Sequence, residues 1–301
     1  MKESMQHRRQ FLKQAAGAAA VASLSTVPNS VFAQETSSEP KICVFTKFLQ
    51  DLSYEDLART IRELGFDGVE ATVRKKGHVL PERVEEDLPK MMNAFKKEGL
   101  EVLAMATDVK GADELSERVL KTAAGLGVKW YRMGFYKYDP DRHILEQLDE
   151  IKPKLADLAA LNKDLGVQGL YQNHSDKKYV GATLWDLHRL IHDLPIEQIG
   201  SAFDIRHTTI EAGLSWPVLY DVMRPHIGAI FVKDFQWDGK KAKHVPLGTG
   251  RVDPKFFELV KKSDYKGPYS LHVEYLGKEG TEANVAALRR DLAKLKSWLT
   301  L

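Results

Sequence analysis

Charged and imidazole side chains stand at the ends of several apolar segments of the sequence. In "AIFVKDFQWD" (229–238) four apolar residues lead directly into Lys233 and Asp234, and in "SLHVEY" (270–275) His272 and Glu274 follow an apolar start. Other apolar segments end in the same kinds of side chain: Glu70, Arg132, Gln172, His174, Asp204, Arg206 and His207. Charges within buried strands cost free energy unless they are paired or bind a metal. These residues therefore predict a functional site built from strand ends.

The residue types favour a site for a divalent ion (Mn²⁺, Zn²⁺, Co²⁺ or Mg²⁺). The expected ligands among these residues are Asp204, Glu274, His174 and His207. Lys233, beside a metal or in a dry pocket, is a candidate catalytic acid or base. The alternative for Lys233 is an ion pair with Asp204 or Glu274.

A second set of residues has the chemistry to bind a polyhydroxylated substrate. It consists of Glu70, Arg132, His174, Arg206, His207, His272 and His244. Arg132 and Arg206 suit a carboxylate or a pair of hydroxyl groups, with salt bridges as the alternative. His244 lies on the long segment expected to be a loop after the seventh apolar segment, and Trp237 on that segment either stacks on a sugar ring or covers the core.

The elements that must position these residues alternate regularly. Apolar runs begin near residues 42, 68, 101, 129, 168, 200, 229 and 270, with amphipathic helical patterns between them. In the first such helix Leu57, Ile61 and Leu64 share a face, Ser53 suits the N-cap and Gly65 suits the end. Eight strands alternating with helices predict a single (β/α)8 barrel over residues 41–301. An open doubly wound sheet is the alternative, but "VFTKFLQDLS" lacks its glycine-rich phosphate loop.

The first 33 residues predict a targeting signal. Arg8 and Arg9 precede an alanine-rich segment that is shorter than the roughly 20 apolar residues of a membrane span. The pattern resembles a twin-arginine export signal with cleavage before Gln34, which leaves residues 34–40 as a linker and predicts a periplasmic or otherwise exported protein.

The chain without this segment is nearly neutral. Removing its four basic residues and one acidic residue changes the totals from 44 basic and 42 acidic residues to 40 and 41. Such near neutrality argues against a nucleic-acid partner, and the lone Cys43 allows no internal disulfide.

The order of short motifs resembles the xylose isomerase-like TIM barrel superfamily of sugar phosphate isomerases and epimerases. The motifs are "GVEA" (68–71), "YQNHS" (171–175), "FDIRH" (203–207), "VKDF" (232–235), "VPLGTGRVD" (245–253) and "HVEY" (272–275). The resemblance implies a divalent metal held by a Glu, an Asp, a His and a Glu from strands five to eight. Asp204 and Glu274 match this set, whereas Gln172 replaces the first Glu and Phe231 replaces the His. Gln172 still offers a carbonyl oxygen as a fifth expected ligand. The resemblance also implies that the ion polarises a carbonyl group while a base removes the adjacent proton, and Glu274 is the expected base. Because glutamine cannot accept a proton, proton exchange by two glutamates on opposite faces of a sugar is not expected.

These observations predict an exported enzyme that isomerises or epimerises a sugar or keto-sugar. Its small-molecule partner is a carbohydrate, and phosphorylated sugars are not expected outside the cytoplasm. One alternative is a lyase or hydrolase of keto-sugar glycosides, which begins with the same proton removal. Another is an inactive barrel that binds a sugar or a partner protein. A DNA repair enzyme of the same fold would need more histidine and acidic ligands and a basic groove. The sequence contains no feature that selects a dimer over a monomer.

Overall fold

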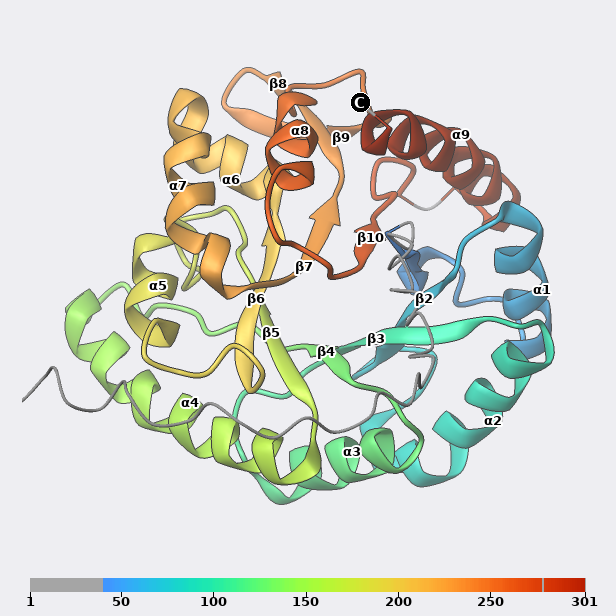
Figure 1. Ribbon diagram of the computed structural model, residues 1–301, viewed down its shortest axis with the longest axis horizontal. Helices are drawn as coiled ribbons and strands as arrows, with labels where there is room; N and C mark the ends of the chain where they lie inside the picture. Colours follow the sequence, from blue (N-terminus) through green and yellow to red (C-terminus); the bar gives the residue numbers. More distant parts are fainter. Residues whose placement is uncertain (1–39, 278, 301) are drawn as a thin grey trace, which may run out of the picture. The chain divides into compact units, whose positions relative to one another are not determined.

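Eight parallel strands form a closed barrel in the computed structural model, which describes residues 40–277 and 279–300 (Figure 1). Around the barrel the strand order is β1-β10-β7-β6-β5-β4-β3-β2. The barrel strands are β1 (Ile42–Phe45), β2 (Gly68–Val73), β3 (Glu101–Thr107), β4 (Trp130–Arg132), β5 (Gln168–Gln172), β6 (Ile199–Asp204), β7 (Ile227–Val232) and β10 (Tyr269–Leu271). The expected (β/α)8 barrel is therefore confirmed. The expected export signal and most of the linker lie outside the described residues.

Helices connect successive strands and surround the barrel (Figure 1). The α-helices are α1 (Tyr54–Leu64), α2 (Val84–Lys97), α3 (Glu114–Gly125), α4 (Ile144–Leu165), α5 (Trp185–Ile191), α6 (Ile205–Ala212), α7 (Trp216–Met223), α8 (Lys255–Lys261) and α9 (Thr281–Leu299). Short 3-10 helices are η1 (Thr46–Phe48), η2 (Pro81–Arg83), η3 (Gly213–Ser215) and η4 (Arg224–His226). As expected, the Ser53 side chain caps α1 and Gly65 ends it with a positive φ of 83°. None of the described helices is long and apolar enough to cross a membrane.

An apolar layer inside the barrel supports the predicted site. Leu170, Ala202, Ala229 and Phe231 form a buried cluster, and Trp130 packs against it. Each of four site residues follows a member of this layer by two positions: Arg132, Gln172, Asp204 and Lys233. Because residues two apart on a strand share a face, these polar side chains point into the barrel one layer closer to the carboxyl ends of the strands. Phe231 thus forms part of the floor beneath the site.

The segment after β7 differs from the expected loop. Strands β8 (Asp234–Asp238) and β9 (Lys241–Val245) form an antiparallel hairpin. In it Trp237 pairs with Ala242, and Phe235 pairs with His244. Gly239 at its turn has a positive φ of 56°, which glycine adopts at little cost. The hairpin leaves the barrel at the carboxyl end of β7, on the side where the strand-end residues gather.

Candidate active site

Seven polar side chains form a closed ring across the carboxyl ends of the strands, and we call this set the polar ring. Its members are Glu70, Arg132, Gln172, Asp204, Lys233, Glu274 and His272. Arg132 Nε lies 3.2 Å from Glu70 Oε1, and Arg132 Nη1 donates to Gln172 Oε1 at 2.6 Å. Gln172 Nε2 then donates to Asp204 Oδ2 at 2.8 Å. Strands β2, β4, β5 and β6 are linked in this way.

Lysine and histidine complete the ring on its other side. Lys233 Nζ lies 3.1 Å from Asp204 Oδ2 and 3.1 Å from Glu274 Oε1. His272 places Nδ1 at 3.5 Å from Glu274 Oε1 and Nε2 at 2.8 Å from Glu70 Oε2. The alternative expectation for Lys233, an ion pair with Asp204 or Glu274, is met with both carboxylates at once. The site residues predicted from strand ends thus form one continuous network.

The carboxylates of the ring differ in their access to solvent. The side chains of Glu70 and Asp204 are fully buried, whereas that of Glu274 is 16% exposed. Burial alone would raise the pKa of Glu274, but the charge of Lys233 and the neighbouring His272 hold that pKa well below its usual range. Lys47 of η1 adds a more distant positive charge at 3.5 Å. Glu274 is therefore an ionised carboxylate at the mouth of the barrel.

The pKa of Glu70 is also lowered, although burial opposes this change. The charge and hydrogen bond of His272 and the charge of Arg132 outweigh the burial, and Ser270 Oγ donates to Glu70 Oε2 at 2.7 Å. Glu70 Oε2 is thus hydrogen-bonded within the barrel, whereas Oε1 has only the ion-pair contact with Arg132 Nε and no hydrogen-bond partner in the described part of the chain. Glu70 holds His272 and Arg132 in place, and it does not face the mouth as a free substrate ligand.

Imidazole groups form a second cluster beside the ring. The rings of His174 and His207 lie 4.1 Å apart, and Ser175 Oγ is 2.8 Å from His207 Nδ1. Burial, followed by the charge of Lys233, lowers the pKa of both histidines. Burial and the charge of Arg206 lower the pKa of His244 to about 4. These side chains are therefore neutral at neutral pH, when each ring carries one N–H donor and one acceptor nitrogen.

Two of these imidazole nitrogens lack partners. His207 Nε2 and His244 Nδ1 are buried and make no hydrogen bond within the described part of the chain. His207 Nε2 lies 3.7 Å from Asp204 Oδ2, too far for a hydrogen bond. Because a buried polar atom without a partner costs free energy, these nitrogens suit hydroxyl groups of a bound ligand.

Arg206 does not continue the strand beyond Asp204. The chain turns into α6 at Ile205, and the Asp204 side chain caps this helix by accepting from the His207 N–H at 3.1 Å. Arg206 Nη2 donates to the Ala242 carbonyl at 3.1 Å, and its guanidinium lies over the Phe235 ring. Arg206 therefore fastens the β8–β9 hairpin to α6, a role that the period-two pattern of a strand did not reveal.

Asp234 has a structural role outside the ring. Its Oδ1 accepts from the N–H groups of Phe235 and Val252, and its Oδ2 accepts from those of Gly248 and Gly250, at 2.8 to 3.0 Å. A Cβ atom at Gly250 would lie only 2.1 Å from Asp234 Oδ1, so this close approach requires glycine. The motif "VPLGTGRVD" is thus held by Asp234.

Two residues near the site were given no role by the sequence analysis. Lys47 follows β1 and reaches Glu274, although the single charged residue of "TKF" gave little reason to choose it as a site residue. Asn173 follows Gln172, and its Oδ1 accepts from the Asp204 N–H at 2.7 Å while its Nδ2 donates to Thr208 Oγ1 at 3.0 Å. Asn173 therefore orients Asp204 from behind. Its position between two predicted site residues was the available signal.

The donor set does not fit a divalent metal in this arrangement. No group of three or more His, Cys, Asp or Glu side chains in residues 40–277 and 279–300 is placed to hold one. Asp204 and Glu274 share the Lys233 ammonium, and Gln172 gives its carbonyl oxygen to Arg132. The five expected ligands therefore do not surround a common point: Asp204, Glu274, Gln172, His174 and His207.

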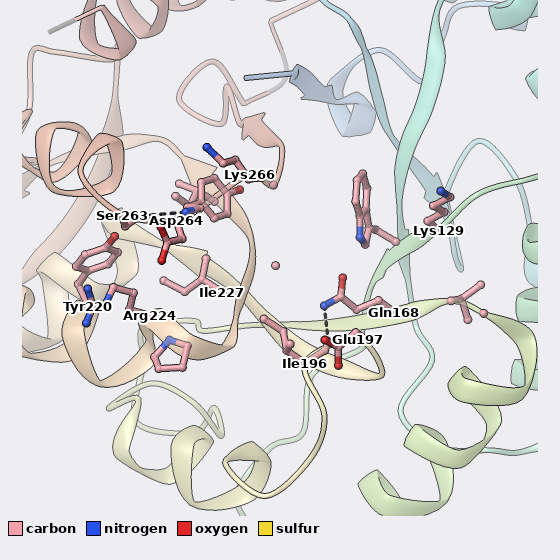
Figure 2. Close-up of a pocket in the computed structure, with 18 residues that line it drawn as sticks. Lys129, Gln168, Ile196, Glu197, Tyr220, Arg224, Ile227, Ser263, Asp264 and Lys266 are labelled. Atoms are coloured by element: carbon pink, nitrogen blue, oxygen red, sulfur yellow. Dashed lines mark hydrogen bonds between the residues drawn. The ribbon is translucent and has the colours of Figure 1, made fainter. Parts of the chain in front are cut away.

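A cavity of about 770 Å³ lies at the opposite end of the barrel (Figure 2). Its lining includes Trp130, Gln168 and Ile227, which are the first residues of β4, β5 and β7. Figure 2 shows Gln168 on one side of this space and Asp264 and Lys266 on the other. No member of the polar ring lines this cavity. Because (β/α)8 enzymes carry their chemistry at the carboxyl ends of the strands, the polar ring remains the candidate active site.

A family model described as "Xylose isomerase-like TIM barrel" matches residues 58–298. No curated protein matches the sequence. Among solved structures, 3-keto-D-glucoside 4-epimerase from E. coli is 21% identical, with a TM-score of 0.65 over 86% of this chain and 99% of that one. A xylose isomerase-like TIM barrel protein from Mycobacterium smegmatis in complex with magnesium is 16% identical, with a TM-score of 0.67 over 88% and 98%. D-allulose 3-epimerase from Methylomonas sp. in complex with D-allulose is 15% identical, with a TM-score of 0.66 over 86% and 97%.

Proposed function

The chain belongs to the xylose isomerase-like TIM barrel family, and from this premise we propose that it is an enzyme that isomerises or epimerises a sugar or keto-sugar. The reaction begins with removal of the proton on the carbon next to the carbonyl group. The names of the similar structures, a 3-keto-glucoside epimerase and an allulose epimerase, support this substrate class.

The observation that carries the proposal is the pair formed by Glu274 and Lys233. Glu274 is the one carboxylate of the ring that reaches the mouth, and Lys233 Nζ lies 3.1 Å from it. In the proposed step Glu274 takes the proton from carbon, and the electron pair of the broken C–H bond moves toward the carbonyl oxygen. Lys233 donates a hydrogen bond to that oxygen and stabilises its developing negative charge.

The resting ion pair explains how Glu274 becomes basic enough for this step. The positive charge of Lys233 lowers the pKa of Glu274 against the effect of burial, so free Glu274 is a weak base. A substrate carbonyl that accepts a hydrogen bond from Lys233 weakens this pairing and raises the basicity of Glu274. Since Gln172 cannot accept a proton, Glu274 acts as the single base. The proton it takes from carbon exchanges with solvent, and Glu274 then delivers a proton to the neighbouring carbon, as a single-base isomerase does.

The remaining polar groups suit the hydroxyl groups of a sugar. The unpartnered His207 Nε2 and His244 Nδ1 are neutral imidazole nitrogens beside the ring. Arg132 is engaged with Glu70 and Gln172, which makes it a positioning residue. His174 packs against His207 and Tyr179 and closes the mouth on that side.

Proton exchange tests the proposal directly. Keto-sugars and keto-sugar glycosides are incubated with the protein in deuterated water, and the signal of the proton next to the carbonyl is followed by NMR. We expect loss of this signal with the carbon skeleton and any glycosidic bond intact. Release of an aglycone would indicate the lyase or hydrolase instead. Retained binding without exchange or product would indicate an inactive sugar-binding barrel.

We also propose that the protein is exported through the twin-arginine route, on the basis of Arg8, Arg9 and the alanine-rich segment after them. Residues 1–40 fused to a reporter should direct it out of the cytoplasm, and replacing both arginines with lysine should retain it there. Export of the double-lysine variant would contradict the twin-arginine assignment. An exported location favours unphosphorylated sugars as substrates.

A further inference from the structure

We infer that the Lys233 ammonium group takes the place of the divalent metal ion in this site, so that this chain binds no such ion between Asp204 and Glu274. The geometric part of this inference stands on side-chain contacts alone. Its catalytic part, that Lys233 polarises the substrate carbonyl, rests on the proposed function.

Lys233 occupies the space that a shared ion would need. Its Nζ lies at 3.1 Å from both Asp204 Oδ2 and Glu274 Oε1, which come from opposite neighbours of β7 in the barrel. Two carboxylates that share one cation are the usual core of a divalent site. Here the shared cation is covalently part of the chain, and its side chain is only 4% exposed. An entering ion would have to displace a buried ammonium group from both of its partners.

The orientation of the Gln172 amide also excludes Gln172 as a ligand of an ion between Asp204 and Glu274. Arg132 carries only donors, so the Gln172 atom at 2.6 Å from Arg132 Nη1 must be the carbonyl oxygen. The carboxylate of Asp204 carries only acceptors, so the Gln172 atom facing it at 2.8 Å must be the NH₂ group. The amide therefore directs hydrogen atoms toward Asp204, where an ion would require a lone pair.

Phe231 places an apolar ring beneath Lys233. Its side chain is buried, and its ring centroid lies 4.7 Å from that of His272. His272 gives Nε2 to Glu70 and directs Nδ1 toward Glu274 Oε1 at 3.5 Å. Phe231 itself supplies no ligand atom. Three separate features, at Lys233, Gln172 and Phe231, point to the same conclusion.

The ammonium group retains what the proposed reaction needs from a cation. It bears three N–H donors. One is donated to Glu274 Oε1, the contact with Asp204 Oδ2 is an ion pair, and an N–H group remains for an oxygen atom of the substrate. A single charge with a hydrogen-bond donor stabilises an enolate oxygen as other preorganised donors do. The chemistry is thus electrostatic and proton-based, with every atom supplied by the chain and the substrate.

Metal content and calorimetry test the inference without reference to activity. We expect the full chain from Gln34 onward, purified without chelators and dialysed against MnCl₂, to retain less than about 0.1 ion per chain, because the Lys233 ammonium group already pairs with both carboxylates. Calorimetric titration with Mn²⁺ should give no saturable heat. About one ion per chain in this protein, lost in Asp204→Asn, would overturn the inference.

Variants at Lys233 and Lys47 separate this claim from general charge effects. Lys233→Met leaves two uncompensated carboxylates, so we expect it to bind Mn²⁺ at least about tenfold more tightly than the parent protein. Lys233→Arg keeps the cation and should not bind Mn²⁺. Lys47→Met is the matched control, because it removes a lysine that lies 3.5 Å from Glu274 but is 41% exposed and does not bridge Asp204.

The outcomes distinguish this inference from the proposed function. Circular dichroism shows whether Lys233→Met is folded. If the folded variant still fails to bind Mn²⁺, this result would contradict the inference that the ammonium group takes the place of a metal ion. Equal gains of affinity in Lys233→Met and Lys47→Met would contradict the bridging role. Failure of the deuterium exchange experiment would remove the proposed reaction but leave these binding results unchanged.

Discussion

At the scale of single residues, the three carboxylates of the polar ring have the same chemistry but different surroundings. Asp204 and Glu70 are fully buried and paired with neighbouring cations, whereas Glu274 keeps part of its side chain at the mouth. Asp204 also caps α6 and is held by Asn173. Truncating Asp204 would therefore disturb both the helix and the ring, which makes Glu274 the cleaner position for a test of catalysis.

Glu274→Gln should abolish proton exchange while leaving the fold intact. The amide keeps the size and the hydrogen-bonding capacity toward Lys233 but cannot accept a proton, so we expect exchange in deuterated water to slow by about 10² to 10⁴-fold. Glu279→Gln, in the exposed segment that follows, is the control and should retain the parent rate. An unchanged rate in Glu274→Gln would assign the base to another residue.

His244 should make the stability of the barrel depend on pH in a defined window. Burial, followed by the charge of Arg206, lowers its pKa from 6.5 to about 4. Between these values the unfolded chain binds a proton that the folded chain does not, so stability falls as the pH decreases from 6.5 to 4. His244→Gln should make this slope shallower by at most about 1.4 kcal/mol per pH unit.

Urea unfolding of the parent protein and His244→Gln at several pH values between 7 and 4 measures this effect. His174 and His207, whose pKa values are also lowered, contribute equally to both proteins and cancel in the comparison. Identical slopes in the two proteins would show that His244 is protonated to the same extent in the folded and unfolded states.

The identity of the site residues could be predicted from the sequence, but their partners could not. A polar residue at the end of an apolar strand marks a side chain that points into the barrel, and this pattern found every member of the polar ring. Which oxygen faces which nitrogen depends on strand register and side-chain length. The sequence therefore left two roles possible for Lys233, acid–base catalysis and an ion pair. The two 3.1 Å contacts show the ion pair.

At the scale of elements, the β8–β9 hairpin and the loop after it depend on one carboxylate. Asp234 binds four backbone N–H groups, from the start of the hairpin and from the segment 248–252. The sequence marked the strands by their apolar runs, yet it missed this hairpin. Its exposed face carries Gln236, Asp238 and Lys243 in place of an apolar run, so its pattern is that of a surface segment.

Asp234→Asn should destabilise the protein by about 3 kcal/mol or more, because one amide oxygen replaces two charged acceptors and its NH₂ group faces backbone donors. Urea denaturation measures the change. Asp238→Asn in the same hairpin is the control: it loses only an exposed pair with Lys243 and should change stability by about 0.5 kcal/mol or less. Equal effects of the two substitutions would contradict the role assigned to Asp234.

At the scale of the whole molecule, the site depends on closure of the barrel. The polar ring runs from Glu70 on β2 across the barrel to Glu274 after β10, and His272 closes it back to Glu70. These two sides of the ring are joined in the barrel through β1, which pairs with β10 on one side and with β2 on the other. The first strand after the expected linker is therefore as important to the site as the strands that carry its residues.

Removal of β1 should abolish cooperative folding, whereas removal of everything before it should not. A chain that starts at Pro40 keeps both sets of β1 pairings, and we expect a single cooperative thermal transition. A chain that starts at Thr46 loses Ile42–Phe45, which exposes the edges of β2 and β10 and the apolar core that β1 covers. Circular dichroism melting and binding of a hydrophobic dye compare the two. Because the ring needs β2 and β10 to be held at a fixed separation, a cooperative transition at the same temperature in the shorter chain would mean that something other than β1 sets the distance from His272 to Glu70.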